Sequence, residues 1–210
     1  MRWQGKKGSD NVEDRRSGGS TTRTVGGIGI GVIIMAIIVQ LLGGDGCSII
    51  QQAVVNQPQT QQAPHQTSEA EDELAQFVKV VLQQTEDVWN KVLPEQNGMN
   101  YEEPVLVLFS GQISSACGNA SAATGPFYCP GDHKLYIDLS FYQQLRTQFQ
   151  APGDFAMAYV VGHEVGHHVQ NLMGFTQYVH QQKRRISEKQ YNQLSVRLEL
   201  MADYLAGVWT

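Results

Sequence analysis

Two histidines with a glutamate between them are the residues of this chain best suited to chemistry. The segment from His163 to His167 has the pattern H-E-x-x-H, with Glu164 as its acid. On a helix, histidines four positions apart lie on the same face, so both imidazoles can bind one metal ion. The glutamate points to the adjacent face, where it can take a proton from a metal-bound water. The pattern therefore predicts His163 and His167 as zinc ligands and Glu164 as a general base.

A third ligand has to come from another part of the chain, because a catalytic zinc usually takes three protein ligands and leaves one position for water. The extended pattern H-E-x-x-H-x-x-G-x-x-H is absent, since Gln170 and Met173 stand where it needs glycine and histidine. Glu199 and Asp203 are four positions apart and share one helical face. We predict Glu199 as the third ligand and Asp203 as the acceptor that fixes the N–H of one ligand histidine. The alternatives are Asp203 as the ligand, or two solvated acids.

The segments that carry these residues have the patterns of buried helices. Apolar residues recur at three- and four-residue steps between Asp154, a candidate N-cap, and Gly174, which can end the helix. His168 lies on a different face of this helix, where we expect a hydrogen-bonding or surface histidine. Ser187 can cap the second helix, and the small residues Ala202, Ala206 and Gly207 would let the two helices approach closely.

Upstream segments supply the other elements of the predicted domain. The patterns predict an amphipathic helix over residues 69–92, buried strands over 104–109 and 133–138, and a short helix over 140–149. Strands that precede two helices facing one metal site indicate an α+β fold.

Separate stretches spread over the chain resemble those of a known family. They are Met1–Gly5, Ser9–Arg16, Gly125–Pro130, Tyr136–Tyr142, His163–Gln170 and Arg197–Trp209. The resemblance is to the putative neutral zinc metallopeptidases of bacteria, and it implies a membrane-tethered protein with a zincin-like peptidase domain but no particular substrate. Proteins of that family continue beyond the point that matches Trp209, so we expect this chain to be C-terminally incomplete. Candidate transition-state donors within the chain are Tyr178, His180 and Tyr204.

One segment is apolar enough to cross a membrane. Val25–Gly44 contains no charged residue, and as a helix it would extend about 30 Å, the thickness of a bilayer's hydrocarbon core. Lys and Arg outnumber Asp and Glu in residues 1–24, whereas no Lys or Arg occurs from Gly43 to Glu69. The positive-inside rule then predicts a single-pass protein of the inner (cytoplasmic) membrane, with a cytoplasmic N-terminus and an exported C-terminal domain. The predicted divisions are a basic tail (1–24), a transmembrane anchor (25–44), a Gln-rich linker (45–67) and a zincin-like domain (68–210).

Cysteines and charge bear on compartment and partners. Cys117 and Cys129 lie in a stretch rich in small residues, where we predict a disulfide that closes a short loop. A cysteine metal site is the alternative, but the C-x-x-C spacing is missing. Cys47 is expected to be a free or intermolecular thiol. Acidic residues outnumber basic ones beyond residue 24, which argues against a nucleic-acid partner, and the sequence indicates no oligomeric state.

We therefore expect a membrane-anchored peptidase that hydrolyses peptides or proteins with one zinc ion per chain. In peptidases of this architecture, an edge strand before the motif helix commonly holds the substrate by strand addition. Lys134–Asp138 is the candidate, with an interior position as the alternative. Residues 111–130 could border the cleft or form a disulfide-pinned surface loop. The alternative functions are a catalytically inactive or weak zinc-binding module tethered to the membrane, and a zinc hydrolase acting on non-peptide substrates.

Overall fold

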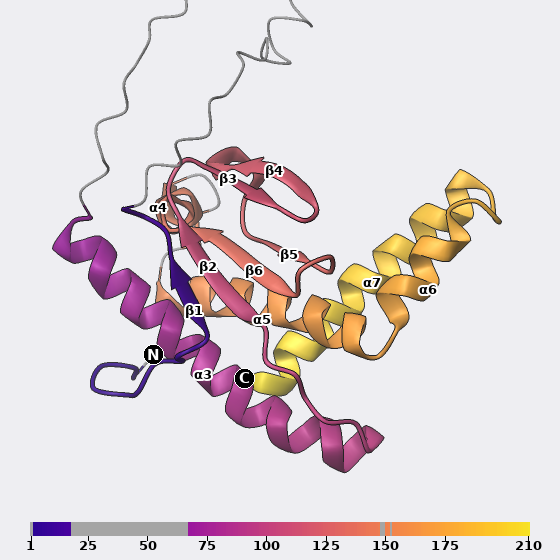
Figure 1. Cartoon of the computed structure of the whole chain (residues 1–210), viewed down its shortest axis with the longest axis horizontal. Helices are drawn as coiled ribbons and strands as arrows, with labels where there is room; N and C mark the ends of the chain where they lie inside the picture. Colours follow the sequence, from indigo (N-terminus) through magenta and orange to yellow (C-terminus); the bar gives the residue numbers. More distant parts are fainter. Residues whose placement is uncertain (1, 18–66, 148–149, 152) are drawn as a thin grey trace, which may run out of the picture. The chain divides into compact units, whose positions relative to one another are not determined.

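Four strands from separate parts of the chain form the main sheet of the computed structural model, which describes residues 2–17, 67–147, 150–151 and 153–210. They are β1 (Val12–Asp14), β2 (Val105–Phe109), β5 (Phe127–Cys129) and β6 (Lys134–Asp138), in the spatial order β1-β2-β6-β5 (Figure 1). β1 and β6 both run parallel to β2, whereas β5 runs antiparallel to β6. β6 is therefore an interior strand, and β5 is the edge strand beside it.

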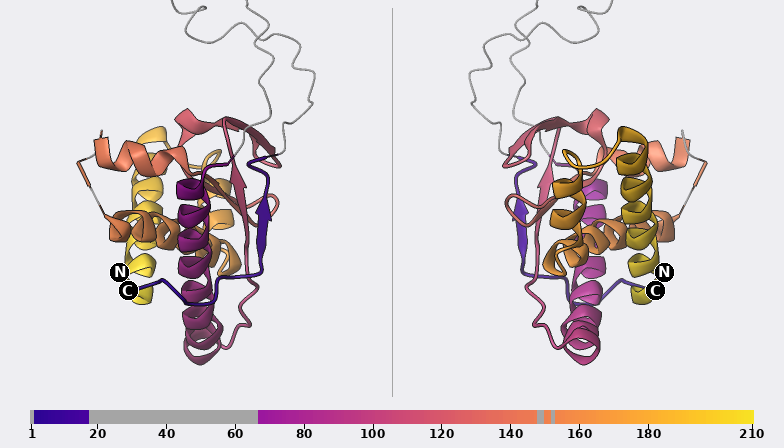
Figure 2. Two further views of the ribbon diagram at one scale, coloured as in Figure 1. Left: turned by 90° about the vertical axis from the view of Figure 1, so that its left-hand side faces the viewer. Right: turned by 90° about the vertical axis from the view of Figure 1, so that its right-hand side faces the viewer.

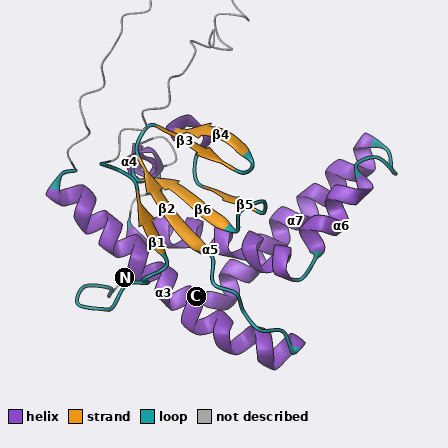
Figure 3. Ribbon diagram, viewed as in Figure 1, coloured by secondary structure: helices purple, strands orange, loops and turns teal. Residues whose placement is uncertain are grey.

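The helices are α3 (Glu69–Asn97), α4 (Ser140–Thr147), α5 (Asp154–Leu172), α6 (Phe175–Gln182) and α7 (Glu188–Trp209), coloured purple in Figure 3. Four of the helices follow the predicted order with shifted ends, and α6 was not predicted. Ser187 and Gln190 form the predicted capping box at the start of α7. The N-cap of α5 is Gly153 rather than Asp154, whose carboxylate instead accepts a hydrogen bond from the Trp3 indole at 3.2 Å. The predicted end of α4 at residue 149 falls outside the described residues.

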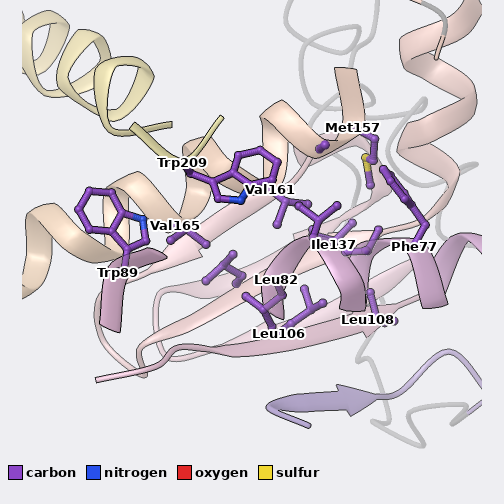
Figure 4. Close-up of a cluster of buried hydrophobic side chains, with 14 of the residues drawn as sticks. Phe77, Leu82, Trp89, Leu106, Leu108, Ile137, Met157, Val161, Val165 and Trp209 are labelled. Carbon is purple, nitrogen blue, oxygen red and sulfur yellow. The ribbon is translucent and has the colours of Figure 1, made fainter. Parts of the chain in front are cut away.

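The core lies between the sheet and the helices α3 and α5 (Figures 2 and 4). Alternate residues of a strand point to opposite faces of a sheet, so Leu106 and Leu108 of β2 face these helices, while Val107 and Phe109 face the other way. Val161 and Val165 of α5 are fully buried against the first face. The motif helix is therefore fixed on the sheet by its apolar side. The description as a mixed α+β fold is confirmed.

Residues 111–129 form structure of their own instead of an irregular loop. β3 (Gln112–Ser115) and β4 (Gly118–Ser121) pair as an antiparallel hairpin, and a short 3₁₀ helix, Ala122–Thr124, leads on to β5. Ile113 of the hairpin packs on the face of the sheet away from the helices. A disulfide joins Cys117 to Cys129 of β5, as predicted, and so ties the hairpin to the edge strand.

The N-terminal residues are part of the same compact unit as residues 67–210, although the sequence predicts a separate tail up to residue 24. The Trp3 and Phe77 rings pack with centroids 5.3 Å apart, and the Ser9 hydroxyl donates to the buried Glu86 carboxylate at 2.7 Å. β1 therefore belongs to the sheet of the domain and not to a separate tail. The cytoplasmic N-terminus and the exported domain stay a prediction.

The predicted anchor Val25–Gly44, Cys47 and all but the last residue of the linker lie outside the described residues. Among the helices that the structure does describe, none combines the length and apolar character needed to span a bilayer.

Candidate metal centre

The close approach of α5 and α7 brings the predicted ligands together. The two helices run in opposite directions, with Gly162 against Ala206 and Gly166 against Ala202. Both alanines are fully buried, as the sequence predicts. Gly207 has a different place, because it is exposed and has no neighbouring atom where a Cβ would stand. Small residues therefore define the contact that lets side chains from both helices meet at one point.

His163, His167 and Glu199 form a compact group of three potential ligands, with one ligand atom from each lying within 4.8 Å of the others. The Nε2 atoms of the two histidines are 3.1 Å apart, and each lies 3.4 Å from Oε2 of Glu199. In a tetrahedral zinc site with ordinary ligand distances, neighbouring ligand atoms lie roughly 3.3 Å apart. The spacing of the three atoms thus fits a zinc ion without rearrangement.

The outer nitrogens of both histidines are held by hydrogen bonds that determine where their protons lie. Nδ1 of His163 is 2.8 Å from Oδ1 of Asp203, and a carboxylate can only accept, so this nitrogen carries the proton. Nδ1 of His167 is 3.0 Å from Oε1 of Gln170, whose amide nitrogen donates to the Leu198 carbonyl at 2.6 Å. Gln170 therefore presents its oxygen, and His167 donates as well. Both Nε2 atoms are left as lone pairs.

These lone pairs converge on each other and on the Glu199 carboxylate. Such an arrangement is repulsive unless a cation stands between the three atoms, because neutral imidazole nitrogens and a carboxylate oxygen all present negative charge. Burial lowers the pKa of His167 and opposes a proton as that cation. A divalent metal ion satisfies all three atoms together.

Tyr159 and Gln170 complete the surroundings of the ligands and were not predicted from the sequence. The Tyr159 hydroxyl donates to Oδ1 of Asp203 at 2.5 Å, which lowers the pKa of Asp203 and raises that of Tyr159 to about 12. The available signal was helical spacing: Tyr159 precedes His163 by four residues, and Gln170 follows His167 by three. Gln170 thus contacts His167 directly, whereas Tyr159 acts on His163 through Asp203.

Glu164 lies apart from the three ligands, in a buried position beside the edge strand β5. Its side chain is 8% exposed, and burial raises its pKa to about 8, although the nearby backbone N–H of Tyr128 opposes this shift. A carboxyl group with a pKa near the working pH can both take and return a proton. Burial and pKa therefore fit the general-base role predicted for Glu164.

The remaining sequence candidates lie elsewhere. His168 is a fully buried, hydrogen-bonded histidine, so only the first of its two predicted roles agrees with the structure. Tyr178 and Tyr204 are 56% and 71% exposed, and His180 also lies on the surface. Within the described part of the chain, no hydrogen bond joins any of these three residues to the metal-ligand group.

An α+β domain in which an H-E-x-x-H helix and a later acidic helix converge on one three-ligand cluster has the features of a metal-binding hydrolase. The chain belongs to the family described as "Putative neutral zinc metallopeptidase", whose pattern matches residues 1–210.

Two relatives illustrate how far the similarity extends. The chain is 43% identical over 217 aligned positions to the uncharacterized protein YpfJ of Escherichia coli strain K12, covering 100% of this chain and 74% of the relative. It is 46% identical over 123 positions to the uncharacterized protein Mb2605 of Mycobacterium bovis, covering 58% of this chain and 39% of the relative. No solved structure matches the chain.

Proposed function

We propose that this protein is a zinc-dependent peptidase in which His163, His167 and Glu199 hold one zinc ion. The observation that carries the proposal is the convergence of two imidazole lone pairs on the Glu199 carboxylate at distances of 3.1 and 3.4 Å. Both imidazoles are already oriented by bonds at their other nitrogen. A bound zinc ion would lower the pKa of a coordinated water toward about 7 and polarise the scissile carbonyl.

Glu164 then performs the proton transfers. Its carboxylate takes a proton from the attacking water as the water oxygen bonds to the scissile carbon. It returns the proton to the amine nitrogen as the carbon–nitrogen bond breaks. Asp203 and Gln170 keep the two histidines in the tautomer that binds metal.

The edge position of β5 favours a peptide as the substrate. The sequence suggested Lys134–Asp138 as the strand that would hold a substrate, but β6 is enclosed between β2 and β5. Only an edge strand has backbone groups free for strand addition. Because the N–H of Tyr128 already reaches Glu164, the free side of β5 faces the proposed base. We propose that a peptide binds along β5.

Metal analysis and peptide cleavage, measured on the full chain, test the proposal. We expect about one zinc per chain in the wild type and in Glu164→Gln. The wild type should cleave a mixed peptide library in a chelator-sensitive way, and Glu164→Gln should not. Glu188→Gln, which changes an exposed acid at the start of α7, is the matched control and should keep both properties. Cleavage by Glu164→Gln at the wild-type rate would overturn the role of Glu164. Zinc binding without any cleavage would favour the tethered interaction module.

We also propose that residues 25–44 attach the protein to a membrane, as their composition suggests. The contacts of residues 2–17 with the domain add a condition. With β1 and β2 in one sheet, the N-terminal residues and residues 67–210 would lie on the same side of that membrane, so residues 25–44 would attach to it without a single complete crossing. The alternative is the topology expected from charge, in which residues 25–44 cross once between a cytoplasmic N-terminus and an exported domain.

A further inference from the structure

Tyr128 and His168 form a buried pair that neither binds the metal nor takes part in the proton transfers proposed above. His168 directly follows the ligand His167, yet its ring is fully buried on another side of α5. We propose that this pair is a positioning device that holds β5 against α5 and so keeps the Tyr128 backbone N–H on Glu164. The proposal rests on the proposed role of Glu164 as general base.

The hydrogen bonds of the pair have one consistent direction. Nε2 of His168 is 2.6 Å from the Glu102 carbonyl oxygen, which can only accept, so Nε2 carries the ring proton. Nδ1 is therefore an acceptor, and the Tyr128 hydroxyl 3.0 Å away donates to it. Asn171 in turn donates to the Tyr128 oxygen at 3.2 Å. The phenol is held both as a donor and as an acceptor by two residues of α5.

Burial keeps both groups in the protonation states that these bonds need. The pKa of His168 falls to about 4 because its ring is removed from water, so the ring stays neutral at physiological pH. Burial also raises the pKa of the Tyr128 phenol, which stays protonated. The rings meet edge to face, with centroids 5.2 Å apart. The contact is therefore a neutral hydrogen bond enclosed by packing.

The backbone of the same tyrosine reaches the proposed base. Tyr128 is the middle residue of the three-residue strand β5, which pairs with β6 on one side only. On its other side, the Tyr128 N–H lies close enough to the Glu164 carboxylate to lower the pKa of that carboxyl group. A strand this short has few backbone bonds to fix it, so a side-chain anchor to α5 has a large share in its position. The N–H occupies one of the carboxylate's lone pairs and leaves others for the water.

Two variants of the full chain test the inference. Tyr128→Phe removes only the hydroxyl, and His168→Gln replaces the ring with a flexible amide. Tyr136→Phe is the matched control. Tyr136 is a buried residue of the neighbouring strand β6, and the variant removes only its hydroxyl, which donates to Asp132 at 2.7 Å. The first readout is hydrogen exchange of the backbone amide at position 128, which requires no catalysis. We expect roughly tenfold faster exchange in both test variants and little change in the control.

The second readout separates positioning from metal binding. Zinc content should stay at the wild-type value in all three variants, whereas kcat should fall about tenfold in Tyr128→Phe and His168→Gln, because the base is no longer held in place. Unchanged exchange at position 128 in folded Tyr128→Phe would overturn the inference, whatever the activity. A wild-type chain without peptidase activity would defeat the proposed function, while the exchange rates would still decide whether the pair holds β5 on Glu164.

Discussion

Gly166 lies so close to Ala202 that a Cβ atom built on the glycine would stand 2.8 Å from the Ala202 carbonyl oxygen. Real Cβ atoms do not approach a carbonyl oxygen this closely, so the glycine sets the distance between α5 and α7. Gly166 lies within the H-E-x-x-H segment, while Ala202 is three residues beyond Glu199. The contact that brings the helices together thus lies beside the ligands from both of them.

Replacement of this glycine should disturb stability and metal binding together. Gly166→Ala pushes α7 away from α5, and overpacking of this kind costs about 1–3 kcal/mol. Glu199 moves with α7, so zinc affinity should fall as well. Urea unfolding and zinc titration measure the two effects. Gly207→Ala, on α7 with open space around it, should be neutral or stabilising by up to about 1 kcal/mol. Equal behaviour of the two variants would contradict the packing argument.

Gln170 joins His167 to the backbone of α7, and its loss should weaken the zinc site. Gln170→Met keeps roughly the side-chain volume but leaves the His167 Nδ1–H without a partner and removes the side-chain bond to the Leu198 carbonyl, which keeps its bond within α7. Each unsatisfied buried group costs about 1–3 kcal/mol, and loss of such a partner typically lowers metal affinity 10–100-fold. Competition with a chromogenic chelator gives the affinity. The exposed Gln177→Met on α6 is the control, and equal zinc affinity in both variants would count against Gln170.

Tyr159 should act on the metal only through Asp203. Asp203→Asn should lower zinc affinity about 10–100-fold, because it weakens the bond to Nδ1 of His163. Tyr159→Phe removes the donor that holds Asp203 and should have a smaller, few-fold effect. In the double variant we expect no additional loss beyond that of Asp203→Asn, as for residues in one network. Additive losses would show that Tyr159 affects the site by another route.

Local spacing made two of the three metal ligands predictable. His163 and His167 follow from four-residue spacing within one helix, and Ser187 marked the start of α7 through a capping pattern three residues long. Glu199 came from the chemical need for a third ligand. The spacing of Gln170 from His167 indicates that these two side chains can meet, but the bond from Gln170 to the Leu198 backbone carbonyl was not predictable, because no side-chain pattern can indicate it.

Long-range pairing accounts for the errors in the fold. β1 has three residues, too few for a periodic pattern, and its partner β2 lies about 90 residues further along the chain. The Lys and Arg residues on either side of β1 were therefore interpreted as a membrane-topology signal alone. The interior place of β6 depends on β5 reaching its far side, which is a property of the whole topology.

His168 should make the protein lose stability in mild acid. Its pKa in the folded protein is about 4, below the ordinary value of 6.5, so between these values the unfolded chain binds a proton that the folded protein does not. Stability contributed by the neutral ring is complete above pH 6.5 and is lost as the pH falls toward 4, by at most about 3 kcal/mol.

Comparison of the wild type with His168→Gln isolates the contribution of the His168 ring to the pH dependence of stability. Unfolding free energies of the wild type and His168→Gln, measured in urea at pH 7 and pH 5, should converge as the pH falls. The raised pKa of Glu164 acts in the opposite direction, and repeating both measurements in a Glu164→Gln background removes its contribution. His133, whose ring centroid lies 5.8 Å from that of His168, is exposed and present in both proteins. Parallel pH profiles would contradict the assignment to His168.

The pairing of β1 with β2 predicts that the N-terminal residues and the domain lie on the same side of the membrane, which the distribution of charge does not predict. Single cysteines placed at the exposed positions Gln4 and Gln193 should react equally with a membrane-impermeant maleimide in intact cells, because both belong to one folded unit. Cys47 is replaced in these chains, and the Cys117–Cys129 disulfide leaves no competing thiol. Equal labelling, or equal protection that ends on cell lysis, would agree with the pairing of β1 and β2. Labelling of only one position would show that residues 2–17 leave the sheet in the membrane-bound protein, and that the charge-based topology holds there.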